Sequence, residues 1–176
     1  GHLSGNIAEM VILSTCNRIE IYVVSSQEFF SELEIFLSEA RGVARDEFVS
    51  HLHHHKDDDV ARHLFNVAAG LDSLVVGEPQ ILGQVTRALE LARGQNTAGP
   101  ILNRLFQSAI HAGKRARTET AISRNPASVS SLAASLSERV VHHLADAQIV
   151  ILGAGEMAEL AVEAFRKRGA NRILVV

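Results

Sequence analysis

The distribution of hydrophobic residues over the first 42 positions predicts two strands followed by a helix. Residues 10–13 are a continuous apolar run, which is typical of a strand buried on both faces. Residues 19–23 carry isoleucine or valine at every second position, which predicts a strand with one buried face. Ser25 and Glu28 resemble a capping box that opens a helix, and Gly42 is suited to end it. The residues of this helix expected to point inward are Phe29, Phe30, Leu33, Phe36, Leu37 and Ala40.

Three further segments have the spacing of amphipathic helices. The first covers residues 57–71 and is ended or interrupted by Gly70 or Gly77. The second follows Pro79, which suits a first helical turn, and the third covers 101–117. The apolar residues that define the first and third segments are Val60, Leu64, Val67, Ala68 and Leu71, and Leu102, Leu105, Phe106, Ala109 and Ile110.

The last 50 residues predict a long helix and one strand–helix–strand unit. Asn125 precedes a proline and is therefore disfavoured in a helix, which marks a boundary. A helix is expected over 128–147, then a strand over 148–152, a helix from 156 to about 168 and a strand over 173–176. A strand–helix–strand unit of this length is the minimum for a parallel crossover. We therefore predict the α/β class, with boundaries near residues 125 and 147.

The amino-acid composition excludes some classes of protein and favours others. The chain has 176 residues, 47% hydrophobic and 21% charged, which is ordinary for a soluble globular protein. Its single cysteine excludes an internal disulfide and fits a reducing compartment, so we expect a cytoplasmic protein. We expect no signal peptide and no membrane span. The chain starts just before one strand and stops on another, which we interpret as a fragment. A net charge of −3 argues against a generally basic nucleic-acid binder.

Cys16 is the first candidate for chemistry. It follows an apolar run and lies among Ser14, Thr15, Asn17 and Arg18, which are polar or cationic. A nearby arginine lowers the pKa of a thiol and so favours the nucleophilic thiolate. The alternative is a small buried hydrophobe at a strand end, the usual role of an unpaired cysteine.

A glycine turn and a histidine are the next candidates. Gly153-x-Gly155-x-x-Ala158 follows an apolar strand and opens a helix, the context in which this pattern binds a dinucleotide phosphate. The alternative is a tight turn without a cofactor. His63 shares the apolar face of its helix with Val60, so it is either a core residue or an acid–base partner of a nucleophile.

Three polar clusters remain. The first surrounds two glycines and suggests a binding loop or simple helix capping: Asp72, Ser73, Glu78, Gln80 and Gln84. The second could bind zinc, but consecutive side chains point to different sides, which favours a solvated loop: His51, His53, His54 and His55. The third is the best local candidate for phosphate contacts, although a solvated face is the simpler interpretation: His111, Lys114, Arg115, Arg117 and Arg124.

Together these segments resemble the glutamyl-tRNA reductase family. The resemblance is carried, in order along the chain, by LSTCNRIEIY (13–22), HLFNVAAGLDS (63–73), VGEPQILGQV (76–85), GKRARTET (113–120) and GAGEM (153–157). It implies an α+β catalytic domain over 1–125, a ferredoxin-like two-layer sandwich that binds glutamyl-tRNA. It further implies a connecting spinal helix over 126–147 and the start of an NADPH-binding Rossmann domain over 148–176.

The resemblance also implies a reaction, in which Cys16 attacks the glutamyl ester and the resulting thioester is reduced by NADPH to glutamate-1-semialdehyde, a tetrapyrrole precursor. His63 matches a histidine important for activity. The matches to substrate-holding positions are Thr15, Asn17, Arg18, Ser73, Glu78, Pro79, Gln80 and Gln84. The matches to the NADPH turn are Gly153, Ala154, Gly155, Glu156, Met157 and Ala158. No residue matches a metal ligand.

Two other functions stay open on the sequence. One is a non-catalytic dinucleotide-binding module, and the other is a different thioester-forming dehydrogenase. The family resemblance implies glutamyl-tRNA as a partner, a homodimer formed through a domain absent here, and a downstream aminotransferase that takes the product. For a plant source, the location implied is the plastid stroma.

Overall fold

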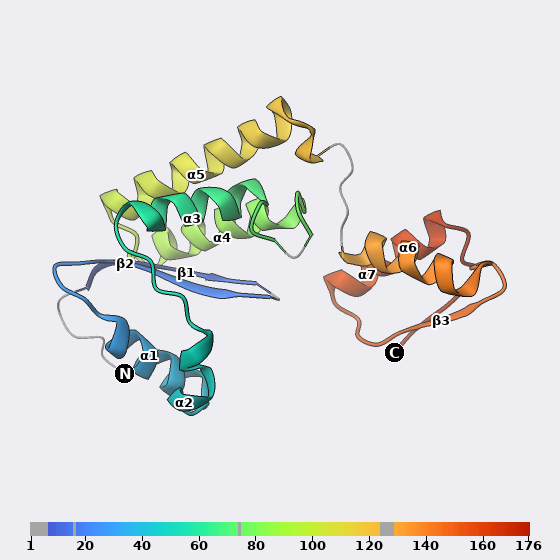
Figure 1. Cartoon of the computed structure of the whole chain (residues 1–176), viewed down its shortest axis with the longest axis horizontal. Coiled ribbons are helices and arrows are strands. Elements are labelled where there is room, and N and C mark those ends of the chain that lie inside the picture. The colour runs from blue at the N-terminus through green and yellow to red at the C-terminus, as the bar shows by residue number, and fades with distance from the viewer. Residues whose placement is uncertain (1–6, 16, 74, 124–128) are drawn as a thin grey trace.

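The structure, a computed structural model, describes residues 7–15, 17–73, 75–123 and 129–176 and contains two separate hydrophobic cores (Figure 1). The α/β class is confirmed, because helices alternate with two small sheets. Among the described residues, no helix combines the length and the apolar content needed to cross a bilayer. The elements are β1 (Ile7–Ser14), β2 (Ile19–Ser25), α1 (Phe30–Arg41), α2 (Arg45–Phe48), η1 (Val49–His51), α3 (Asp58–Ala69), α4 (Gln80–Gly94), α5 (Pro100–Glu119), η2 (Ala121–Ser123), α6 (Val129–Val141), β3 (Gln148–Ile151), α7 (Glu156–Lys167) and β4 (Arg172–Val175).

Strands β1 and β2 form an antiparallel hairpin whose buried face differs from the predicted one. Helices α3, α4 and α5 lie on one side of it and α1 and α2 on the other (Figure 1). Val11 and Leu13 are buried, but Ile12 between them is 42% exposed, so the prediction that this run is buried on both faces is wrong. In β2 the predicted strand is confirmed, but the expectation that the isoleucine and valine face is buried is wrong, because Tyr22 is buried and Ile19 is exposed. The reason is that Tyr22 has both an aromatic partner and a hydrogen-bond acceptor on the helical side.

Helix α1 begins later than predicted. Its first residue is Phe30, and no side chain caps it. The predicted capping box is wrong, because the Ser25 hydroxyl instead donates to the carbonyl of Gln27 and accepts from its N–H group. Ala40, expected to point inward, is exposed, whereas Gly42 ends the helix in the left-handed conformation as predicted.

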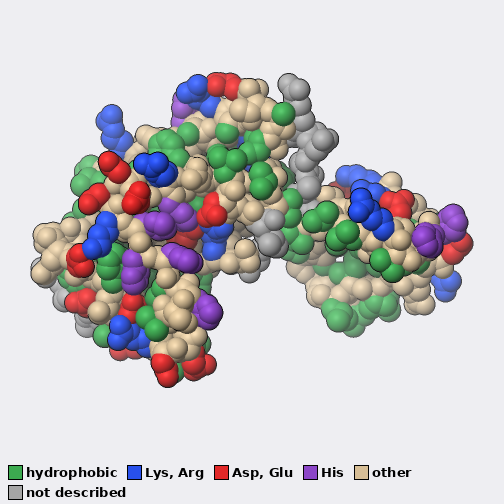
Figure 2. Space-filling view, in the orientation of Figure 1, with side chains coloured by type: hydrophobic (Ala, Val, Ile, Leu, Met, Phe, Trp, Pro, Cys, Tyr) green, Lys and Arg blue, Asp and Glu red, His purple; other side chains and the backbone are tan. Residues whose placement is uncertain are grey.

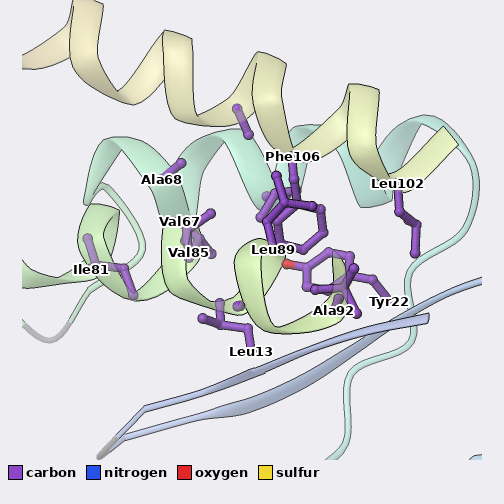
Figure 3. Close-up of a cluster of buried hydrophobic side chains, with 14 residues drawn as sticks. Leu13, Tyr22, Val67, Ala68, Ile81, Val85, Leu89, Ala92, Leu102 and Phe106 are labelled. Carbon is purple, nitrogen blue, oxygen red and sulfur yellow. The ribbon is translucent and has the colours of Figure 1, made fainter. Parts of the chain in front are cut away.

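The larger core lies between the hairpin and helices α3, α4 and α5 (Figure 3). The three predicted helices are confirmed, and α3 ends at Gly70 with φ = 76°. Gly113 permits close packing of α5 on α3, since a Cβ atom there would lie 2.4 Å from the carbonyl oxygen of Ala68. The buried residues of this core are Val11, Leu13, Tyr22, Leu64, Val67, Ala68, Ile81, Val85, Ala88, Leu89, Ala92, Leu102, Phe106 and Ala109.

A buried carboxylate joins β1 to the start of α5. Glu9 is 5% exposed, and its two oxygens accept hydrogen bonds from the backbone N–H groups of Ile101 (3.0 Å) and Leu102 (2.6 Å). These N–H groups belong to the first helical turn, which has no intrahelical acceptors and carries the positive end of the helix dipole. Glu9 therefore satisfies two donors and adds a favourable charge.

We expect Glu9→Gln to lower the free energy of unfolding by about 1–2 kcal/mol, because an amide has one acceptor oxygen and no charge. Urea denaturation would measure the change. Glu39→Gln, at an exposed position on α1, is the matched control and should leave the midpoint unchanged. Equal midpoints for the two variants would contradict the capping role of Glu9.

The second unit contains the predicted strand–helix–strand crossover. Strands β3 and β4 pair in parallel, with Ile149 beside Ile173, and α7 connects them. Helix α6 packs against α7, and the Ser130 hydroxyl donates to the carbonyl of Met157 (3.4 Å). The helix predicted over 128–147 ends at Val141, because His142 takes a positive φ (61°) and turns the chain. Residues 126–128 lie outside the described residues.

Candidate functional site

Four ionisable side chains form one network at the end of the hairpin where the chain turns from β1 into β2. The Nε2 atom of His63, on α3, lies 2.9 Å from Oε1 of Glu20, on β2. The same oxygen accepts a hydrogen bond from Nη1 of Arg18 (2.9 Å), which also donates to Oδ2 of Asp72 (2.9 Å). Arg18 donates a further hydrogen bond to the carbonyl of Asp72, and Nδ1 of His63 lies 3.8 Å from its Oδ2. A histidine and an arginine are thus held together by two carboxylates.

The network depends on the core beneath it. Tyr22 donates its hydroxyl to Oε2 of Glu20 (2.5 Å), and its ring meets Phe106 edge-on, with centroids 5.0 Å apart. Glu20 is 15% exposed and His63 23% exposed, so both lie at the margin of the core. His63 is therefore more than a hydrophobic core residue, since its imidazole is hydrogen-bonded to Glu20 of the hairpin.

A tight turn joins β1 to β2 directly before Arg18. The Thr15 hydroxyl accepts hydrogen bonds from the N–H groups of Asn17 and Arg18 (3.1 Å each). The Thr15 N–H donates in turn to the carbonyl of Arg18 (2.9 Å). Cys16 is within this turn in the sequence but lies outside the described residues. Thr15, one of the polar residues next to Cys16 in the sequence, therefore fixes the backbone of this turn.

Burial and hydrogen bonds shift the pKa values of His63, Glu20 and Tyr22. The hydrogen bond to Glu20 raises the pKa of His63, although burial opposes this, and the negative charges of Glu20 and Asp72 add to it. Burial alone would raise the pKa of Glu20, but hydrogen bonds with His63, Tyr22 and Arg18 lower it below its usual range. Burial, followed by the charge of Glu20, raises the pKa of Tyr22, which stays a hydrogen-bond donor. The pKa of His63 is therefore raised and that of Glu20 lowered by the same contact.

We expect the pKa of His63, measured by NMR titration, to lie above 6.5 and to fall in the variant Glu20→Gln, which loses the carboxylate. A raised pKa stabilises the fold fully below the unfolded value of about 6.5, and this contribution is lost as the pH rises through the folded value. The stability difference between the parent and Glu20→Gln should therefore shrink with rising pH. Glu32→Gln, exposed on α1, is the control; an equal effect in both variants would contradict the pairing.

Three residues of the network were not predicted as site residues: Glu20, Tyr22 and Asp72. The available signal was the spacing Arg18-x-Glu20-x-Tyr22, because residues two apart on a strand share a face. Asp72 was noticed in a polar cluster but not assigned a role. The alternating isoleucines of β2 predict instead that the face opposite to Glu20 and Tyr22 is buried.

The remaining predicted substrate residues lie around the start of α4. Ser73 and Glu78 are half-buried, Pro79 is the residue before the helix, and Gln80 and Gln84 lie on it, both half-buried. Arg117 of α5 donates to the carbonyl groups of Gly77 and Glu78 and so ties this segment to α5. Gly77 has φ = 81°, and a Cβ atom there would lie 2.3 Å from the carbonyl oxygen of Ile122. The geometry of this loop therefore requires glycine.

The glycine turn of the second unit is open in front of its helix. Gly153 has φ = 110° and Gly155 precedes α7; a Cβ atom at either position would meet nothing within 4 Å. The Gly153 N–H donates to the carbonyl of Val176 (2.7 Å), which fixes the turn beside β4. Open space at a helix N-terminus of this kind fits a phosphate group. Ala158 is buried, Ala154 and Met157 are exposed, and Glu156 is the first residue of the helix.

The other clusters lie elsewhere. Helices α4 and α5 border a groove of about 260 Å³ that includes His111 and Lys114, whereas Arg115 pairs with Glu119 (2.8 Å). Arg124 is outside the described residues. The histidine run is exposed and its side chains point to different sides, as predicted. Within the described part of the chain, no three His, Cys, Asp or Glu side chains are grouped as metal ligands.

Comparison with known proteins decides the family. Residues 2–120 match the family described as glutamyl-tRNAGlu reductase, N-terminal domain. The chain belongs to the glutamyl-tRNA reductase family. Residues 135–176 match the family described as shikimate/quinate 5-dehydrogenase, which agrees with a nicotinamide-cofactor unit at this end of the chain.

Individual relatives extend the match over nearly the whole chain. The glutamyl-tRNA reductase of Cyanothece sp. is 46% identical over 97% of the chain, and that of Ruthia magnifica is 40% identical over 99%. The solved glutamyl-tRNA reductase of Methanopyrus kandleri superposes with a TM-score of 0.61 at 34% identity, over 96% of this chain and 40% of that one. The chain spans 40% and 42% of the two curated relatives' own lengths.

Proposed function

We propose that this chain is the glutamyl-tRNA-binding part, with the start of the cofactor domain, of an NADPH-dependent glutamyl-tRNA reductase. The observation that carries the proposal is the His63–Glu20–Arg18 network, which ends at the turn containing the only cysteine in the sequence. A histidine paired with a carboxylate, and a guanidinium two residues from a candidate thiol in the sequence, fit acyl transfer from a glutamyl ester. Family membership supports the same reaction.

The proposed first step is transfer of the glutamyl group to Cys16. The thiolate attacks the ester carbonyl carbon, a C–S bond forms, and the bond from that carbon to the 3′ oxygen of the tRNA breaks. The departing oxygen needs a proton. His63 is suited to donate it, because its hydrogen bond to Glu20 raises the pKa of the imidazole.

The second step reduces the thioester to an aldehyde and frees the thiol. NADPH, when bound, supplies the hydride that converts the thioester carbonyl to that of glutamate-1-semialdehyde, with Cys16 as the leaving thiolate. The residues that would hold its phosphates are Gly153, Ala154, Gly155, Glu156, Met157 and Ala158, where the turn leaves open space in front of the start of α7.

Substrate recognition is proposed to centre on Arg18, because a guanidinium binds a carboxylate in a bidentate manner. Arg18 is already held by Glu20 and Asp72, which orient it, and 19% of its side chain stays exposed for the glutamate carboxylate. Burial alone would lower the pKa of Arg18, but its hydrogen bonds with Asp72 and Glu20 outweigh this effect and raise the pKa. The guanidinium therefore stays charged. The other proposed substrate contacts are Thr15, Asn17, Ser73, Glu78, Pro79, Gln80 and Gln84.

Mass spectrometry of the full-length enzyme mixed with glutamyl-tRNA, without NADPH, tests the proposal. We expect one glutamyl adduct on Cys16, released by hydroxylamine. Uncharged tRNA with free glutamate is the control and should give none. Adduct formation from free glutamate would favour another thioester-forming dehydrogenase, and no adduct under any condition would favour a non-catalytic dinucleotide-binding module.

The assembly around this reaction is also proposed from the family. The boundary near residue 125 is supported by the two family matches, of which one ends at 120 and the other begins at 135, and the boundary near 147 stays a proposal. We propose a homodimer formed through a further domain and transfer of the product to an aminotransferase. The expected location is the cytoplasm, or the plastid stroma for a plant source.

A further inference from the structure

His55 lies directly over the proposed catalytic histidine. Its imidazole ring is stacked on that of His63, with centroids 4.7 Å apart and planes 15° from parallel. The edge of the His63 ring faces two carboxylates, since Nε2 is 2.9 Å from Glu20 and Nδ1 is 3.8 Å from Asp72. His55 thus occupies a face of a ring whose two nitrogens are already engaged.

The segment that carries His55 is fixed on both sides. His54 stacks on Phe30 of α1, with centroids 4.2 Å apart, and its Nε2 lies 3.3 Å from Oε1 of Glu34. Lys56 pairs with Glu28 and lies 5.4 Å from the centre of the Phe30 ring. Side chains alternate along an extended segment, so His55 points away from α1 and toward α3. Figure 2 shows histidine side chains gathered on one face of the larger unit.

We propose that His55 is a positioning residue of the acyl-transfer step, which holds the plane of the His63 ring by stacking on it. This inference rests on the proposed function. Hydrogen bonds to the ring nitrogens of His63 fix where these nitrogens point. They leave the plane of the ring free to rotate about the line to Glu20. A flat neighbour on one face restricts that tilt, and a small misplacement of an acid–base group slows a reaction strongly.

The charges around His63 agree with this role. Glu20 on β2, Asp72 after α3 and Arg18 in the hairpin turn face it together with His55. Glu20 and Asp72 engage the edge of the His63 ring, which leaves its face as the surface that His55 contacts. The role assigned to His55 is therefore stacking, not proton transfer.

Single-turnover acylation of Cys16 in the full-length enzyme, with glutamyl-tRNA and no NADPH, tests the proposal. We expect His55→Ala to slow the maximal rate roughly 10- to 100-fold while the half-saturating tRNA concentration changes little. His55→Phe keeps a flat ring that cannot titrate and should restore the rate to within about threefold of the parent. His53→Ala, exposed in the same segment, is the matched control and should behave as the parent.

NMR titration of His63 in the same variants gives a second readout. His55→Ala should lower the pKa of His63, because a tilted ring loses part of its bond to Glu20, and His55→Phe should keep it raised. Equal rates for His55→Ala and His53→Ala would overturn the proposal, as would a His55→Phe variant as slow as His55→Ala. An unsubstituted enzyme that forms no adduct would instead refute the proposed function itself.

Discussion

Replacement of Cys16 by serine is expected to lower glutamate-1-semialdehyde formation by the full-length enzyme by roughly 10³-fold or more. A serine hydroxyl is almost entirely protonated near neutral pH, whereas a cysteine thiol is far more acidic and forms the stronger nucleophile, the thiolate. The ester of a serine adduct would also be a poorer acceptor of hydride than a thioester. Product formation with saturating NADPH and glutamyl-tRNA measures the loss.

The control for this substitution is Ser14→Ala, at an exposed position two residues earlier in β1. It changes a hydroxyl near the same turn and should keep more than about half of the activity, as surface substitutions usually do. Full activity of Cys16→Ser would exclude the thioester mechanism. Loss of activity in both variants would indicate that the hairpin end, and not the thiol, is needed.

Phe106→Ala is expected to lower the free energy of unfolding by about 3–5 kcal/mol, the range for removing a large aromatic ring from a packed core. Phe106 is fully buried on α5, and its ring meets Tyr22 at an interplanar angle of 80° (Figure 3). The substitution would leave a cavity beside Tyr22, whose hydroxyl supports Glu20. Urea denaturation followed by circular dichroism measures the stability.

Ile101→Ala is the matched control, because this apolar residue lies on the same helix and is 60% exposed. Its substitution should change the stability by less than about 1 kcal/mol. A loss of similar size in both variants would contradict the assignment of the core to the inner face of α5. A Phe106→Ala variant as stable as the parent would do the same.

Helices α3, α4 and α5 could be predicted closely, and the two strands could be located, but the buried faces of the strands could not be predicted. Helices α3, α4 and α5 bury a stripe at intervals of three and four residues, so local spacing alone locates them. In β2 both faces carry residues of high strand propensity. Which face is buried depends on Phe106 and His63, far away in the sequence, and no local pattern shows this.

The candidate site shows the same division. His63 and Arg18 were predicted, because short motifs surround them in the sequence. Glu20 was missed although it accepts hydrogen bonds from both of them and from Tyr22. A single acidic residue among isoleucines is most often solvated, and only the position of α3 next to β2 brings His63 to Glu20. The structure thus adds the residue that links the two predicted ones.

The buried Glu9 also specifies how β1 pairs with its neighbour. Glu9, Val11 and Leu13 lie on one face of β1, because side chains alternate between the two faces of a strand. The same face therefore supplies both the cap of α5 and the contacts with the core. A slip by one residue would turn all three outward and leave two helix N–H groups without acceptors. The contacts of Glu9 near the start of β1 therefore fix the register of the whole strand. That register in turn sets the position of the turn that follows Ser14 at the other end.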